Sequence, residues 1–263
     1  VKQVSCASLT RNVGSQRAIA TGIAYVAEHE KADYLIVADS DLQDKPEDMP
    51  RLLRACIEAG NNKIIFGKRT KRSESIPFRI YYFIYQLLFK LLTQTRITMG
   101  SFSAAPWKYV VRLTHIGELW NHFPGAVIRS GIPYDQIDCY RDPRGYGESK
   151  MKLAPLLVHA FSGFSLFSDI AAARVLIFCF YSTCVLASAA VTLVGLRVFT
   201  DIPIIGWTST LLGVLGIIFM QILTASGMML FIVSFMRMQA PVLPIQGYER
   251  FLFDVNIVYP KTN

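Results

Sequence analysis

The sequence predicts an α/β domain with a parallel sheet, followed by a hairpin of two transmembrane helices. Strand-like and helix-like segments alternate over residues 3–67, which is the pattern of a parallel sheet covered by helices. Two apolar segments without a charged residue, 175–196 and 204–236, follow towards the C-terminal end. Uncharged runs beyond about 18 residues are unusual in soluble cores. A buried core helix is the alternative interpretation of each segment.

The expected sheet region contains five elements. Ligands of such sheets bind beyond the carboxyl ends of the strands. An α/β nucleotide-binding domain normally opens with its own strand and phosphate loop, so we expect this chain to lack its true beginning. The predicted strands are 3–7, 34–38 and 63–67, and the predicted helices are 16–30 and 46–59.

Composition and charge indicate a protein at a membrane surface. The chain is 52% hydrophobic and only 17% charged, with a formal net charge of +8. Between the two apolar segments Arg197 and Asp201 are the charged residues, whereas most basic residues lie outside the hairpin. The positive-inside bias therefore predicts a multi-pass membrane protein with its N-terminal domain and tail in the cytoplasm, and we favour a bacterial inner membrane. No nucleic-acid-binding motif is present, so nucleic acid is not an expected partner.

These features divide the chain into a cytoplasmic domain, interfacial helices, a hairpin and a tail. Residues 77–96 combine a dense apolar and aromatic run with three basic residues, which favours a helix lying in the membrane interface; a core helix is the alternative. The expected segments are a domain over 1–150 that includes helix 77–96, a second interfacial helix over 151–170, two spans over 171–237 and a cytoplasmic tail over 238–263.

The five cysteines are scattered and show no CxxC spacing. This pattern indicates neither a disulfide framework nor a zinc site. We expect reduced thiols.

The acidic sequence that follows strand 34–38 is the main candidate for chemistry. Asp39 and Asp41 are two residues apart at the end of this strand, so both can face one divalent cation, with Gln43 as a further oxygen ligand. Mg²⁺ or Mn²⁺ bound there would neutralise a diphosphate. The alternative is an Asp-rich turn closed by Pro46.

Five short motifs occur in a fixed order before the apolar segments. They are RNVGSQRA at 11–18, DSDLQDKPE at 39–47, GKR at 67–69, GSFS at 100–103 and RGYGESK at 144–150. In this order they resemble the motifs of polyprenyl-phosphate glycosyltransferases, relatives of dolichol-phosphate mannose synthase in glycosyltransferase family 2. The resemblance covers nearly the whole chain.

The resemblance implies a GT-A (Rossmann-like) domain that is incomplete at its N-terminus. It implies an inverting glycosyltransferase that moves a sugar from a nucleotide diphosphate to a membrane polyprenyl phosphate, either undecaprenyl or dolichyl phosphate. For Arg69, Arg144 and Lys150, the alternative role is to add positive charge at the membrane surface. The implied roles are metal and diphosphate binding for Asp39, Asp41 and Gln43, and phosphate binding for Arg69 and Arg144. Ser149 and Lys150 would support the loop that carries Arg144, and Arg11, Asn12 and Ser101 would bind substrate.

Two departures from the family pattern bear on activity. The opening PxYNE motif and the later DDGSxD motif are absent from this sequence. Ser101 stands where many relatives have an Asp that could act as general base. A phosphate monoester is already largely dianionic at neutral pH, so a lipid-phosphate acceptor needs no base. A catalytically silent membrane scaffold is the alternative function, and homo-oligomerisation is left open.

Overall fold

The computed structural model divides the chain into two compact units. The described residues are 3–41, 43–69, 86–87, 89–95, 97–139, 165–200 and 206–259. The sheet unit comprises Val1–Gln86, Thr95–Leu166 and Pro241–Asn263, and the hairpin unit comprises Leu87–Gln94 and Phe167–Ala240. The chain therefore leaves the sheet unit to form the hairpin and returns to it afterwards.

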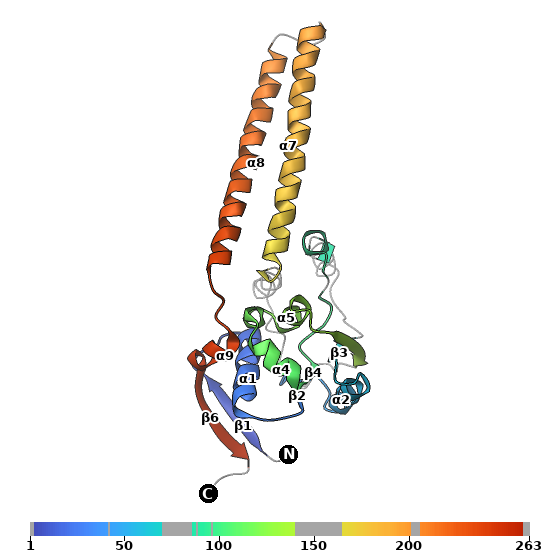
Figure 1. Ribbon diagram of the computed structural model, residues 1–263, viewed down its shortest axis with the longest axis vertical. Coiled ribbons are helices and arrows are strands. Elements are labelled where there is room, and N and C mark those ends of the chain that lie inside the picture. The colour runs from blue at the N-terminus through green and yellow to red at the C-terminus, as the bar shows by residue number, and fades with distance from the viewer. Residues whose placement is uncertain are drawn as a thin grey trace. The chain divides into compact units, whose positions relative to one another are not determined.

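The sheet unit begins with the predicted alternation of strands and helices (Figure 1). All five predicted elements are present, with ends that differ from the prediction by at most two residues. Helix α1 starts after Gly14, whose φ of 80° is in the region that favours glycine, and whose N–H donates to Asn12 Oδ1 at 3.0 Å. The elements are β1 (Val4–Leu9), α1 (Ser15–His29), β2 (Tyr34–Val37), α2 (Asp48–Glu58) and β3 (Ile64–Arg69).

The main sheet is mixed, so the prediction of a parallel sheet is wrong in part. Strand β4 (Ser103–Pro106) lies between β2 and β3 and runs antiparallel to both, whereas β5 (Tyr134–Cys139) pairs parallel with β3. β1 lies outside this sheet and pairs antiparallel with the C-terminal strand β6 (Leu252–Tyr259). β2 and β3 still run in the same direction, because both oppose β4.

The unexpected strand β4 consists of small or compact residues. All four of its residues, Ser103 to Pro106, are buried, so β4 is covered on both faces. It contains no β-branched residue and no polar–apolar alternation, and the sequence pattern therefore does not predict it as a strand. Pro106, which has no N–H to donate, is the last residue of the ladder and lies opposite Tyr34.

Helices cover both faces of the four-stranded sheet. Ile64 and Phe66 of β3 face one core cluster, and Ile65 between them faces the other, which holds Leu52 and Cys56 of α2. Successive strand residues point to opposite faces, so β3 is buried on both sides. The predicted α/β architecture is confirmed. The first cluster also contains residues of α1, α4 (Trp107–Thr114), η1 (Gly117–Trp120) and α5 (Phe123–Arg129).

The residues after the hairpin, expected only as a tail, are folded into the sheet unit. They form α9 (Pro244–Gly247), η2 (Tyr248–Arg250) and β6. The indole N–H of Trp120 donates to the carbonyl of Val242 at 2.8 Å. Tyr248 is 2% exposed, and burial, followed by the neighbouring Glu28, raises the pKa of its hydroxyl. The C-terminal segment thus contributes to the core of the sheet unit.

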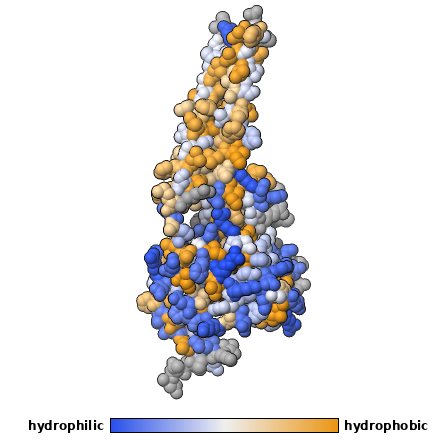
Figure 2. Space-filling model, in the orientation of Figure 1, coloured by the Kyte–Doolittle hydropathy of each residue, from blue (hydrophilic) through white to orange (hydrophobic). Residues whose placement is uncertain are grey.

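The hairpin unit contains two long apolar helices that lie side by side, α7 (Ser168–Phe199) and α8 (Trp207–Met238) (Figure 1). Their mean hydropathy reaches 2.0 and 2.1, respectively, and each is long enough to cross a hydrocarbon core of about 30 Å. Figure 2 shows apolar side chains over much of the visible face of this hairpin. The hydroxyls of Thr192, Thr224 and Ser226 donate to carbonyls one turn earlier, an arrangement that would satisfy them in a bilayer. Length and composition therefore favour a pair of membrane spans.

The predicted interfacial helices are described only in part. In the first, residues 86–87 and 89–93 are helical, and the ring of Phe89 meets that of Phe167 edge to face at 5.8 Å. Residues 77–85 and 151–164 lie outside the described residues. An interfacial position of either helix stays a prediction.

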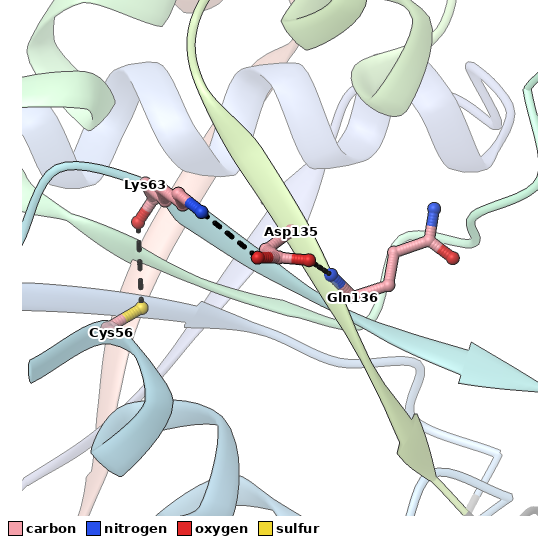
Figure 3. A network of polar contacts seen from close by, with 4 residues as sticks. All are labelled: Cys56, Lys63, Asp135 and Gln136. Atoms are coloured by element: carbon pink, nitrogen blue, oxygen red, sulfur yellow. Dashed lines mark hydrogen bonds and ion pairs between the residues drawn. The ribbon is translucent and has the colours of Figure 1, made fainter. Parts of the chain in front are cut away.

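A polar network joins the starts of β3 and β5 (Figure 3). The ammonium group of Lys63 donates to Asp135 Oδ2 at 3.1 Å, and the backbone N–H of Gln136 donates to Asp135 Oδ1 at 2.9 Å. These two bonds, with the backbone bond the larger cause, lower the pKa of the Asp135 carboxyl group. The Cys56 thiol faces the carbonyl of Lys63 at 3.9 Å.

The C-terminal segment should be required for the stability of the sheet unit. We expect Tyr248→Ala to lower the free energy of unfolding by about 3–5 kcal/mol, because a large buried aromatic residue is lost. Phe253→Ala is the matched control, since this side chain is 77% exposed, and it should change stability by about 0.5 kcal/mol or less. Thermal unfolding in detergent measures both. Equal melting temperatures of the two variants would contradict a packed C-terminal segment.

The Asp135 network should give a small, acid-sensitive stabilisation. Because the folded state lowers the pKa of Asp135, the stabilisation is present above the unfolded value of about 3.9 and is lost as the pH falls through the lower folded pKa. The pair is exposed, so the effect should stay below about 1 kcal/mol. We expect the melting temperature of Asp135→Asn to lie slightly below that of the wild type at pH 7 and to converge with it once the pH is below the folded pKa of Asp135. A difference that widens in acid would be the wrong sign.

Candidate active site

The acidic turn after β2 is closed by its own side chains. The backbone N–H of Asp39 donates to Asp44 Oδ2 at 3.1 Å, and the backbone N–H of Gln43 donates to Asp41 Oδ1 at 3.1 Å. Asp44 is 8% exposed, whereas Asp39, Asp41 and Gln43 are half-buried. The turn therefore contains one buried carboxylate, that of Asp44, and two partly accessible carboxylates, those of Asp39 and Asp41.

The geometry of this turn differs in one respect from the sequence prediction. β2 ends at Val37, so Asp39 and Asp41 are not residues of a strand, and the alternation of strand side chains does not set their directions. The bond from Gln43 N–H to Asp41 instead makes an Asx turn. Each carboxylate has about four lone-pair sites, so Asp41 can accept more than one contact.

Strand register brings the predicted motifs 39–47, 67–69 and 100–103 to one edge of the sheet, which we call the site edge. Ser103, the first residue of β4, lies opposite Val37 of β2 and Phe66 of β3. β4 runs antiparallel, so Ser101 enters the sheet where β2 leaves it. Ser101 is 9% exposed, and its carbonyl accepts the Ser103 hydroxyl at 3.2 Å. The acidic turn and Ser101 are thus at the ends of adjacent strands.

The motif GKR contributes the end of β3 to the same edge. Arg69 is the last residue of β3 and lies opposite Cys139 of β5; its side chain is outside what the structure describes. Gly67 donates its N–H to the carbonyl of Phe102 at 2.9 Å. A Cβ atom on Gly67 would lie 2.7 Å from Phe102 Cδ1 and 3.1 Å from Cys139 Sγ. Glycine is therefore required for Phe102 to pack beside β3.

The start of α2 adds residues that the sequence analysis missed. The Asp48 carboxylate pairs with the guanidinium of Arg51, whose Nη2 also donates to the carbonyl of Asp138 at 3.1 Å. Burial, followed by the negative charge of Asp48, raises the pKa of Cys139 to about 11, so this thiol is protonated at neutral pH. The three-residue spacing of Asp48 and Arg51 on a helix is the sequence signal that points to this pair.

The other predicted site residues are not joined to the site edge by strand register. Arg11 and Asn12 follow β1, which belongs to the two-stranded sheet. Asn12 shapes the start of α1 through its bond to Gly14. Arg144, Ser149 and Lys150 lie outside the described residues.

The acidic turn has the donor chemistry of a Mg²⁺ or Mn²⁺ site. Asp39, Asp41 and Gln43 supply hard oxygen ligands, which these cations prefer. Among the described residues, no group of three or more His, Cys, Asp or Glu side chains could hold a metal ion. Mg²⁺ usually binds one or two carboxylates together with waters and substrate phosphates, so two carboxylates fit a cation that a diphosphate also ligates.

Comparison with known proteins agrees with the α/β fold and the acidic turn described above. Residues 2–108 match the family "Glycosyl transferase family 2". This part of the chain is therefore similar to glycosyltransferase family 2, as the motifs predict. The chain is also 26% identical over 214 residues to the "Uncharacterized glycosyltransferase YkcC" of Bacillus subtilis (strain 168). The match covers 79% of this chain and 63% of that relative.

The close packing at Gly67 gives a test of the site edge. We expect Gly67→Ala to lower the free energy of unfolding by about 1–3 kcal/mol, because the added methyl group overpacks the core between Phe102 and Cys139. The matched control is Gly22→Ala, in α1, where a Cβ atom meets open space; it should stabilise the protein by about 0.5–1 kcal/mol. Melting temperatures should move in opposite directions. A neutral Gly67→Ala would show that Phe102 is not held against β3.

Proposed function

We propose that the protein is an inverting, metal-dependent glycosyltransferase that moves a sugar from a nucleotide diphosphate to a membrane polyprenyl phosphate. The observation that carries the proposal is the acidic turn at the site edge, within a region similar to glycosyltransferase family 2. Two apolar helices long enough to span a bilayer support a lipid acceptor.

The donor end of the reaction depends on the acidic turn. Asp39, Asp41 and Gln43 are the residues that would hold Mg²⁺ or Mn²⁺. When bound, the cation supplies charge stabilisation for the leaving diphosphate. Arg69 and Arg144 would contact phosphate oxygens of the donor or lipid, because a guanidinium offers a fork of N–H donors. Ser149 and Lys150 would support the loop of Arg144.

The acceptor end needs no general base. A phosphate monoester has a second pKa near 6, so most of it is dianionic at neutral pH. Its oxygen can therefore attack the anomeric carbon without losing a proton, while the bond from this carbon to the diphosphate breaks on the opposite face. Attack from that face inverts the anomeric configuration. Ser101 binds substrate in this proposal, and it has no proton-transfer role.

The location of the reaction follows from charge and hydrophobicity. The apolar helices would hold the protein at the membrane where the lipid head group is presented, and the excess of basic residues outside the hairpin favours a cytoplasmic site. Arg11 and Asn12 would bind the donor from the loop after β1.

The metal role predicts a large loss of activity in Asp41→Ala. Purified full-length protein in detergent would receive Mn²⁺, a panel of radiolabelled nucleotide sugars and polyprenyl phosphate, and the label transferred to lipid would be counted. We expect kcat/KM to fall by about 100-fold or more, because a metal contribution of several kcal/mol is lost. Asp33→Ala, which removes an exposed acid before β2, should retain activity.

Two outcomes would contradict the proposal. Turnover retained by Asp41→Ala would refute the metal role. A wild-type protein that transfers no sugar to lipid phosphate from any donor would instead favour a silent scaffold with this fold.

A further inference from the structure

Arg51 joins the first turn of α2 to the end of β5. Its guanidinium pairs with the Asp48 carboxylate and donates through Nη2 to the carbonyl of Asp138 at 3.1 Å. Asp138 is next to the last residue of β5, and β5 ends beside Arg69 of β3. A single side chain thus connects the helix after the acidic turn with the site edge.

The connection between the acidic turn and α2 is short and contains several hydrogen bonds. Asp44 accepts the N–H of Asp39. Four residues further on, the N–H of Asp48 donates to the carbonyl of Lys45 at 3.0 Å, and the N–H of Met49 donates to the carbonyl of Pro46 at 3.1 Å. These hydrogen-bonded turns couple the position of Asp39 and Asp41 to that of α2. A shift of the first turn of α2 would therefore move the acidic turn with it.

The burial of Asp48 makes a cation at this position necessary. The Asp48 side chain is 7% exposed, whereas that of Arg51 is 49% exposed. The Oδ2 atom of Asp48 has no hydrogen-bond partner among the residues that the structure describes. A buried carboxylate without its partner is strongly destabilising. Without Arg51, the Asp48 carboxylate would also carry an uncompensated negative charge near Asp44, beside the proposed diphosphate site.

We propose that Arg51 is a positioning residue for the donor site. It holds the start of α2, and through it Asp39 and Asp41, against the end of β5, and it does so through Asp48 without touching the donor. This inference rests on the proposed function and deepens it. Residues that orient metal ligands from behind typically contribute about 10- to 100-fold in metal affinity or activity.

Arg54 provides the matched control. It lies on the same helix and is exposed, and in the described part of the chain no hydrogen bond or ion pair joins it to β5. Arg54→Ala removes the same charge from the same element as Arg51→Ala. Any effect of net charge on cation binding should therefore appear equally in both variants.

The test is direct binding of Mn²⁺ to full-length protein in detergent, with uridine, guanosine or thymidine diphosphate added in turn. Electron paramagnetic resonance measures the unbound Mn²⁺, so the readout does not depend on turnover. We expect Arg51→Ala to weaken Mn²⁺ binding by about tenfold or more, and Arg54→Ala to stay within about twofold of the wild type. Arg51→Lys keeps a charge beside Asp48 but loses the fork of donors, and it should be intermediate.

A second variant keeps the test decisive if Arg51→Ala does not fold. The double change Asp48→Asn with Arg51→Gln removes both charges, so no unpaired charge is buried, and it should weaken Mn²⁺ binding to the same extent. Wild-type affinity in either variant would overturn the inference alone, even if the melting temperature falls. A wild-type protein that binds Mn²⁺ with none of the diphosphates would overturn the proposed function and this inference together.

Discussion

The pairing of β4 between β2 and β3 is the constraint on which the sheet unit depends. β2 and β3 are not paired with each other, and each pairs with β4. Adjacent strands lie about 4.8 Å apart, so the register that sets Ser103 opposite Val37 and Phe66 also sets the acidic turn beside the segment that contains Ser101. A slip of one residue would turn every side chain of β4 to the other face.

Tight packing makes this edge a rigid support for the loops above it. Phe102 packs beside β3 because Gly67 has no side chain. α2 packs against the sheet through Leu52 and Cys56, which are fully buried. Functional residues on loops need such a scaffold to keep their geometry. Asp39 and Asp41 are therefore attached to a well-packed part of the sheet unit, although they lie outside any regular strand.

Strong periodic patterns explain what the sequence predicted well. The apolar run 34–37, the amphipathic helices α1 and α2 and the two apolar helices were all recognisable from local composition. β4 was missed because its four residues owe their strand conformation to neighbours far along the chain. β6 was missed although it contains β-branched and aromatic residues, because the residues after the hairpin were expected only as a tail.

The candidate site was predicted to a similar extent. Asp39, Asp41 and Ser101 could be located because short motifs mark them. Their mutual placement could not, because the sequence shows neither the end of β2 at Val37 nor the antiparallel direction of β4. The pairing of Asp48 with Arg51 was missed despite its three-residue spacing, since a single acid in a first helical turn usually interacts favourably with the helix dipole and needs no further explanation.

The charge at the site edge bears on the choice of acceptor. Asp39, Asp41, Asp44 and Asp48 already supply four carboxylates near this edge, and the proposed reaction brings a diphosphate and a phosphate monoester together there. A carboxylate in place of Ser101 would repel a dianionic nucleophile at a position that is nearly closed to water, where charges are weakly screened. A hydroxyl acceptor would have the opposite requirement, because it must lose a proton to a base. A small neutral residue at position 101 therefore suits an acceptor that is already ionised, and this is the chemical property that distinguishes a lipid phosphate from a sugar hydroxyl.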